Sequence, residues 1–240
     1  MRKVSITDFY VMKGMLFPTA ALCLVIGIVM AFWMKTPAIA GVPLAMFIPY
    51  TVVMNQWAID EKSGWGSFRL AMAETRNNLV NARYGEMVLY LVMAGVLGWL
   101  ICVGVDWVMR AAGFPIDAFG SPGLNVSPLM VYLVISVSSA LLIGLAIAVS
   151  MPLLAAFGGL KGIMLIPVFT MMASGMLLKG IFTVGKSIHF GDFAKSAFPL
   201  LAATQDGMLV LIMLIGSIFI SLCLVVSWLV ARRLYKVREF

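Results

Sequence analysis

The chain has 240 residues, of which 62% are hydrophobic and 11% are charged, and its formal net charge is +7. So few polar side chains cannot cover the surface of a soluble globule of this length, which excludes a soluble enzyme or binding domain. A membrane-spanning helix needs roughly 20 apolar residues, so the length allows about six spans with short connections. We therefore predict one all-α integral membrane domain over residues 1–240.

The basic residues stand beside the hydrophobic runs and form no stripe with interleaved aromatic side chains. This distribution argues against nucleic-acid binding and is typical of the positive-inside bias of membrane proteins. Cys23, Cys102 and Cys223 each lie inside an apolar run, without CxxC or Cys/His spacing. We expect these cysteines to pack in the membrane, and we expect no metal or cofactor site in this chain.

The N-terminal residues 1–15 mix apolar and charged side chains, as in a short helix that lies in the membrane interface. The first span is predicted over about residues 16–34, with Pro18 in its first turn, where a missing N–H costs little. Residues 38–40 resemble a signal-peptidase site, but the apolar run before them is longer than a signal core. We therefore expect the first span to be retained.

Further apolar runs predict the remaining spans, and Pro152 is expected to separate the fourth span from the fifth. These spans are predicted over about residues 38–59, 87–109, 128–151, 153–178 and 207–231. Small residues recur every fourth position in the fourth span and once more in the fifth, which indicates close helix packing. The predicted packing positions are Ser136, Ala140, Gly144, Ala148, Gly158 and Gly162.

Most of the lysines and arginines fall on one side of the six predicted spans if both termini lie on that side. The positive-inside bias then places both termini, and the polar segment after the second span, in the cytoplasm of a bacterial cell. Residues 179–206 form the longest predicted connection on the opposite face.

One sequence motif, Gly180 to Ser187, satisfies the phosphate-loop pattern G-x-x-x-x-G-K-[ST]. A working phosphate loop needs a buried strand, a following helix and a magnesium-binding acid, which this chain cannot supply, so we interpret the match as false. The acidic residues all fall at span ends or in connections, and the single histidine, His189, lies in the outer connection. The chain is therefore not expected to be an enzyme or an ion-coupled transporter.

Two acidic residues, Glu86 and Asp106, stand at the ends of the third span. We expect Glu86 to pair with Arg83, which lies about one helical turn away. Asp106 is followed by Trp107 and Arg110, which indicates an anchor at the membrane interface.

The longest strongly polar segment, residues 60–84, reads DEKSGWGSFRLAMAETRNNLVNARY. Its charged residues are interleaved with apolar ones such as Trp65 and Phe68, which indicates a docking helix. Together with its place after the second of six spans, this segment resembles the small type 2 permeases of ATP-binding cassette exporters. Ala73 stands where that family usually has proline, so the turn is less rigid here.

The resemblance implies that residues within 60–76 form a cytoplasmic coupling helix that seats in a groove of a separate ATPase, with Thr75 capping the next helix. The implied coupling residues are Glu61, Lys62, Trp65, Phe68, Arg69, Met72, Thr75 and Arg76. The alternative is an interfacial helix that rests on the lipid surface. ATP and Mg would bind the partner ATPase, and a second permease copy or a homologous permease would complete the path.

The function that follows is export of an amphipathic substrate, with a cytolytic or antimicrobial peptide, or a drug, as the expected cargo. The 19 methionines suit such cargo because their side chains adapt to varied shapes. Two other classes stay open from the residues alone. One is a non-transporting sensor, assembly factor or immunity protein with a docking loop, and the other is a passive channel.

Overall fold

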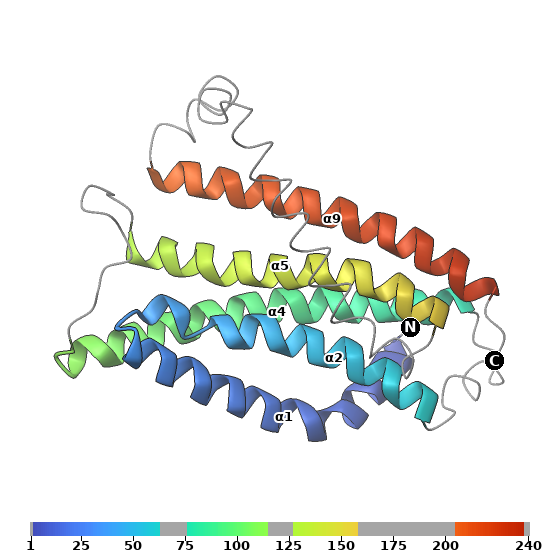
Figure 1. The fold of residues 1–240 in the computed structure, drawn as a ribbon, viewed down its shortest axis with the longest axis horizontal. Helices are drawn as coiled ribbons and strands as arrows, with labels where there is room; N and C mark the ends of the chain where they lie inside the picture. The colour runs from blue at the N-terminus through green and yellow to red at the C-terminus, as the bar shows by residue number, and fades with distance from the viewer. Residues whose placement is uncertain (1, 63–75, 115–126, 158–204, 238–240) are drawn as a thin grey trace.

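A computed structural model describes residues 2–62, 76–114, 127–157 and 205–237 (Figure 1). Within these ranges every secondary-structure element is a helix, and turns connect them. The elements are α1 (Arg2–Trp33), the short 3-10 helix η1 (Pro37–Ile39), α2 (Val42–Lys62), α4 (Arg76–Ala111), α5 (Pro128–Phe157) and α9 (Gln205–Val237).

The described part of the chain contains 5 stretches long and apolar enough to cross a membrane. They are Gly14–Trp33, Pro37–Ile59, Asn77–Ala111, Pro128–Ala156 and Leu209–Tyr235, and they cover most of the predicted spans over 16–34, 38–59, 87–109, 128–151 and 207–231. The predicted span over 153–178 lies mostly outside the described residues, because α5 ends at Phe157 and the description resumes at Gln205.

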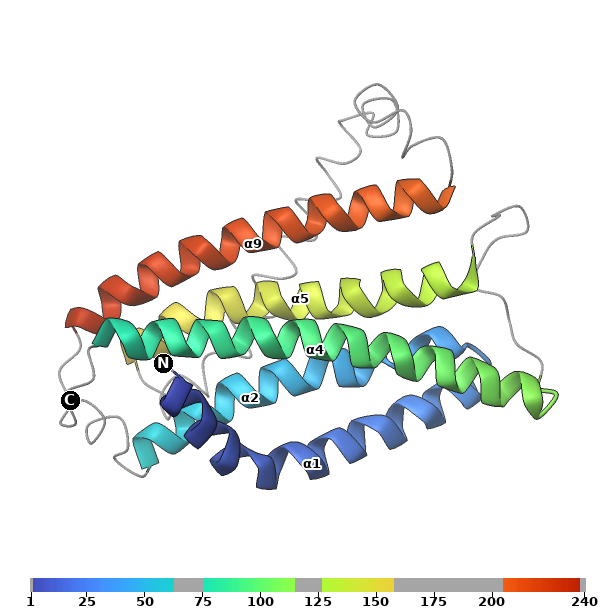
Figure 2. The same cartoon turned by 180° about the vertical axis from the view of Figure 1, so that it is seen from behind.

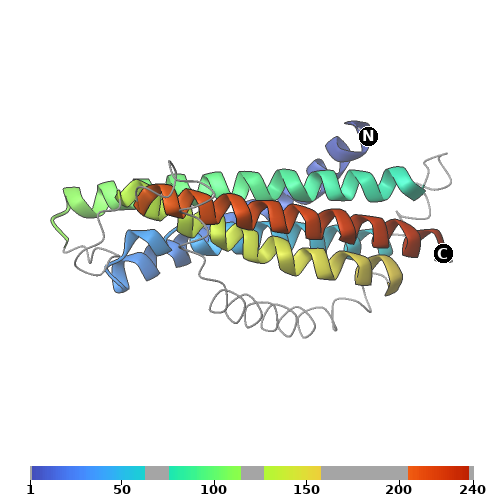
Figure 3. The ribbon, with the colours of Figure 1, turned by 90° about the horizontal axis from the view of Figure 1, so that it is seen from above.

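The N-terminal segment differs from the prediction, because residues 1–15 do not form a separate interfacial helix. Arg2–Trp33 is one helix with Pro18 in its interior. Proline removes one backbone hydrogen bond and bends a helix, and the N-terminal part of α1 turns away from the axis of the rest (Figures 2 and 3). The hydroxyl of Thr19 donates to the carbonyl of Met15 at 2.8 Å, next to this proline.

The break predicted at Pro152 is also wrong, because α5 continues through this proline to Phe157. In a helix, the nitrogen of Pro152 cannot donate to the carbonyl of Ala148. The hydroxyl of Ser227 in α9 donates to that carbonyl at 2.6 Å. A contact from another helix thus satisfies the acceptor that the proline would leave open.

α1 and α4 end in the same kind of C-terminal cap. After α4, Gly113 has a φ of +68°, and the amide of Phe114 donates to the carbonyl of Met109. After α1, Lys35 takes the equivalent left-handed position with a φ of 53°. These are Schellman motifs, and the rings of Phe32 and Phe114 meet edge-to-face at 5.2 Å between centroids, which joins the two helix ends.

The helices α1, α2, α4 and α5 alternate in direction, and α9 runs parallel to α5, so the bundle has two distinct ends (Figures 1 and 2). We call the end that carries both chain termini the terminal end; Lys62, Arg76 and Phe157 also lie there. The opposite end, with η1, Ala111, Pro128 and Gln205, is the hairpin end. Within the described residues, the span of α2 is the most buried and that of α9 the least.

Candidate functional site

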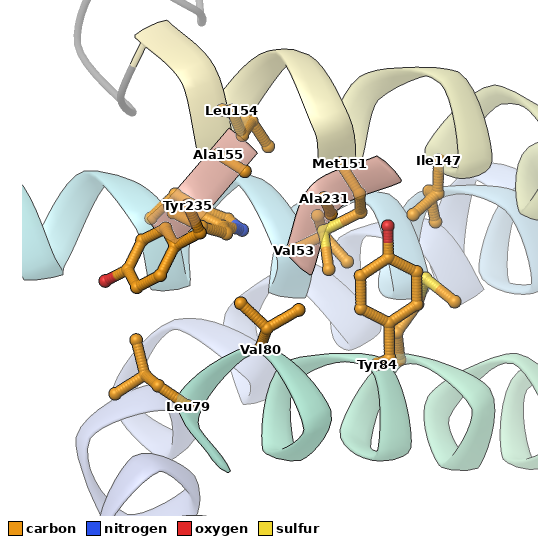
Figure 4. Close-up of a cluster of buried hydrophobic side chains, with 12 residues drawn as sticks. Val53, Leu79, Val80, Tyr84, Ile147, Met151, Leu154, Ala155, Ala231 and Tyr235 are labelled. Atoms are coloured by element: carbon orange, nitrogen blue, oxygen red, sulfur yellow. The ribbon is translucent and has the colours of Figure 1, made fainter. Parts of the chain in front are cut away.

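The largest cluster of buried apolar side chains lies at the terminal end, where α2, α4, α5 and α9 meet (Figure 4). Its members come from all four helices and point toward one another. They are Val53, Trp57, Leu79, Val80, Tyr84, Met87, Ile147, Met151, Leu154, Ala155, Ala231 and Tyr235. The cluster therefore joins the C-terminal part of α2 to the N-terminal part of α4, the two helices that flank the predicted coupling residues.

Hydrogen bonds between side chains tie α4 to α9 at this end. Because Ser227 donates its one hydroxyl proton to α5, the hydroxyl of Tyr84 donates to the Oγ of Ser227, at 2.6 Å. Three helices thus meet at the Ser227 hydroxyl. The indole of Trp228 donates to the amide oxygen of Asn81 at 2.8 Å, one turn closer to the first residue of α4.

Aromatic contacts close the cluster toward the end of the bundle. The rings of Trp57 and Tyr235 meet edge-to-face with 6.0 Å between centroids. The guanidinium of Arg232 lies 4.8 Å from the centroid of the Trp228 ring, within cation–π range. The ring contact with Trp57 holds the C-terminal turns of α9 against α2, and the Arg232 contact lies within α9.

A buried polar cluster joins α2 and α4 at the same level, because its residues are sequence neighbours of Trp57, Tyr84 and Met87. The amide of Gln56 donates to Glu86 at 2.6 Å, and the guanidinium of Arg83 lies 4.0 Å from the same carboxylate oxygen. All three residues are buried, with exposed fractions of 5% for Gln56, 7% for Glu86 and 3% for Arg83. The predicted pairing of Glu86 with Arg83 is confirmed, and Gln56 is a partner that sequence reasoning missed.

The second charged pair of α4 lies at the hairpin end and is more exposed. Arg110 donates from Nε to both carboxylate oxygens of Asp106, at 3.0 and 2.9 Å. Trp107 is 72% exposed beside it, as expected for an interface anchor. Glu86 and Asp106 are separated by about 30 Å along the helix at 1.5 Å per residue, which is the thickness of the hydrocarbon core.

The small residues of α5 line its contact with α4. The hydroxyl of Ser136 donates to the carbonyl of Gly95 at 2.7 Å. A Cβ added to Gly95 would lie 3.7 Å from the Cβ of Ala140, and one added to Gly144 would lie 3.3 Å from Leu91. Ala148 instead offers its carbonyl to α9, as described above.

Sequence reasoning missed a set of close backbone contacts at the hairpin end. A Cβ on Gly27 would overlap the carbonyl of Ala40, and one on Gly41 would overlap the carbonyl of Gly98. The thiol of Cys102 donates to the carbonyl of Ala38 at 3.3 Å and accepts from the amide of Gly41 at 3.3 Å. Cys102 thus packs and hydrogen-bonds in this contact, which joins η1 to α4.

The coupling residues implied by the resemblance are only partly covered. Glu61 and Lys62 are the last residues of α2, and Arg76 is the first of α4. Several other predicted positions lie outside the described residues. They are Trp65, Phe68, Arg69, Met72, Thr75, Gly158, Gly162, His189 and the motif at 180–187.

Taken together, the apolar helices define a multi-pass α-helical membrane protein. Its largest buried cluster among the described residues lies at the terminal end. A family model described as ABC-2 family transporter protein matches residues 5–236, and the chain belongs to this family. The resemblance to type 2 permeases is thereby confirmed at the level of an ABC-2 permease, a transport component without an ATPase domain of its own. No curated protein and no solved structure matches the chain.

Proposed function

We propose that this chain is the permease subunit of an exporter that moves an amphipathic substrate out of the cell, driven by a separate ATPase. The observation that carries this proposal is the arrangement around residues 63–75. The helices that flank this segment, α2 and α4, enter one buried cluster at the terminal end and are joined there by Gln56 and Glu86. A movement of the segment would therefore be passed directly into the bundle.

The charge distribution supports a cytoplasmic terminal end. In the described ranges, most basic residues of α2, α4 and α9 lie in the helix turns nearest the terminal end, whereas Lys35 follows α1 and Arg110 lies in the last turn of α4, at the hairpin end. Those of the terminal end are Lys62, Arg76, Arg83, Arg232, Arg233 and Lys236. By the positive-inside bias, both termini and the coupling residues face the ATPase in the cytoplasm of a bacterium.

The positions of two helix ends support a sixth span. Phe157 lies at the terminal end and Gln205 at the hairpin end, so the chain between them has to lead from one end to the other (Figure 1). The predicted span over residues 153–178 meets this requirement. A permease with six spans and both termini on one side would pair with a second copy or a homologous permease.

The cargo we propose is an amphipathic peptide with cytolytic or antimicrobial action, or a drug of similar character. Methionine side chains adapt to irregular apolar shapes, and the chain has 19 of them. ATP and Mg act on the partner ATPase, whose closure would shift the coupling helix and repack the spans.

The test is a double substitution, Phe68→Asp with Arg69→Asp, in the chain expressed with its ATPase. Replacing one apolar and one basic side chain of the proposed docking surface with carboxylates should lower recovery of the ATPase in a membrane pull-down by at least about tenfold, because hot-spot contacts contribute about 2 kcal/mol or more. Transport of a fluorescein-labelled amphipathic helical peptide into inverted vesicles should fall in parallel.

The control is Phe119→Asp, in the connection between α4 and α5 at the hairpin end, which should leave both measurements unchanged. If the unsubstituted chain recovers no ATPase, the permease proposal fails and a sensor or assembly role takes its place. Peptide-independent ion flux without ATP would instead indicate a passive channel.

A further inference from the structure

The hydrogen bond between Gln56 and Glu86 occupies a particular place in the bundle. Gln56 lies six residues before the last residue of α2, and Glu86 lies ten residues after the first residue of α4. The two side chains therefore join the helices that lead into and out of residues 63–75. Among the described residues, this hydrogen bond between two side chains connects α2 to α4.

Burying these groups has a cost that packing alone does not require. Glu86 and Arg83 are less than a tenth exposed, and ionisable groups near the membrane interior are expensive and usually functional. An apolar pair of the same volume would hold two helices at least as tightly. What a hydrogen-bonded pair adds is a fixed register, since the 2.6 Å contact is lost when one helix slides past the other.

Neighbouring residues of α4 are bonded to a third helix, α9. Tyr84 and Asn81, on the same turns of α4, are bonded to Ser227 and Trp228 of α9. Any shift of α4 relative to α2 would break the Gln56 contact, whereas a shift of both helices together would keep it. The hydrogen bond between Gln56 and Glu86 thus favours movement of α2 and α4 together.

We infer that Gln56 and Glu86 are positioning residues that hold together α2 and α4, the helices on either side of residues 63–75. The two helices then respond to the ATPase as one body. The inference rests on the proposed function. Beyond that function, the inference names the residues through which a displacement of residues 63–75 is shared between α2 and α4.

The experiment uses the full chain with its ATPase in lipid nanodiscs and vesicles, with Gln56→Leu and, in parallel, Gln56→Met, which keeps the length of the side chain without a donor. Amide hydrogen exchange should rise about tenfold over residues 53–59 and 77–86, as expected when a hydrogen bond to a buried charge is removed. Transport of the labelled amphipathic peptide per ATP hydrolysed should fall about tenfold, while the ATPase stays bound.

The swap Gln56→Glu with Glu86→Gln keeps a donor and an acceptor in the pair and keeps the carboxylate near Arg83. It should restore both measurements to within about twofold of the unsubstituted chain, because a hydrogen bond between charged and neutral partners is re-formed. A merely structural role would not require that transport per ATP follow the hydrogen bond.

The matched control is Asp106→Asn, which removes a carboxylate from the same helix at the other end and should change neither measurement more than twofold. The inference is overturned if both Gln56 variants keep normal exchange and normal transport per ATP, if the swap folds without restoring them, or if Asp106→Asn has an equal effect. Failure of the proposed function is seen separately, as absence of ATP-driven transport in the unsubstituted chain.

Discussion

The helices are held together by different kinds of contact at the two ends of the bundle. At the hairpin end, backbones touch through Gly27, Gly41 and Gly98, and the contact leaves no room for side chains. At the terminal end, large aromatic side chains and a buried charged cluster lie between α2, α4, α5 and α9. Apolar lipid offers no hydrophobic driving force, so close van der Waals contact is the efficient way to hold helices together.

This difference indicates different mechanical roles. Backbone contacts between glycines have no side-chain rotamers to exchange, so they fit one arrangement only. A cluster of aromatic rings and hydrogen-bonded side chains can exchange partners between discrete arrangements. We therefore interpret the hairpin end as the more rigid part of the bundle and the terminal end as the part that can rearrange.

The strongest way to break the terminal end is Arg83→Leu. The change removes the cation beside a buried carboxylate, and breaking a buried ion pair costs about 3–5 kcal/mol of unfolding free energy. Thermal unfolding of the purified chain in detergent measures the loss. The double variant Arg83→Leu with Glu86→Leu should recover much of it, because neither charge is then buried alone. An unchanged midpoint for the single variant would show that this charge is not held in the interior.

The hairpin end should break with a single added methyl group, in Gly98→Ala. The new Cβ would lie 2.5 Å from the Oγ of Ser136 and 3.0 Å from the carbonyl oxygen of Gly41. Overpacking of this kind costs about 1–3 kcal/mol, again read from thermal unfolding.

The control for this change is Gly104→Ala on the same helix, where the added Cβ meets nothing within 4 Å. It should stabilise the chain by up to about 1 kcal/mol through helix propensity. Equal midpoints for the two alanine variants would mean that the backbones at Gly98 are not in contact.

The smallest effect is expected for Asp106→Asn. Arg110 is 57% exposed in this pair, and exposed ion pairs contribute about 0–1 kcal/mol. The loss should shrink further when salt is raised, because salt screens exposed charges. A loss as large as that of Arg83→Leu would contradict the contrast between the two ends.

The sequence was sufficient for features that depend on local composition. Apolar runs located the described spans, and the four-residue spacing of Ser136, Ala140 and Gly144 marked the face of α5 that packs on α4. The pair of Glu86 with Arg83 followed from helical spacing alone. The ABC-2 family was recognisable from the polar segment after the second span.

Features that depend on distant contacts were missed or wrong. Pro152 was read as a helix break because its effect on Ala148 is local, whereas the compensating hydroxyl of Ser227 lies 79 residues away in the sequence. Gln56 gave no signal, since a polar residue near a span end is also typical of the headgroup region. The contact of Gly41 with Gly98 depends on how two hairpins cross, which no local pattern contains.

The uninterrupted length of α4 turns it into a lever. Its 36 residues contain no proline and measure about 54 Å at 1.5 Å per residue. If the backbone contact at Gly98 is the fulcrum, the arm toward Arg76 is about 33 Å long and the arm toward Ala111 about 20 Å. A tilt of about 5° would then move the terminal end by about 3 Å and the hairpin end by less than about 2 Å. A displacement of the terminal end would therefore reach the hairpin end as a smaller one.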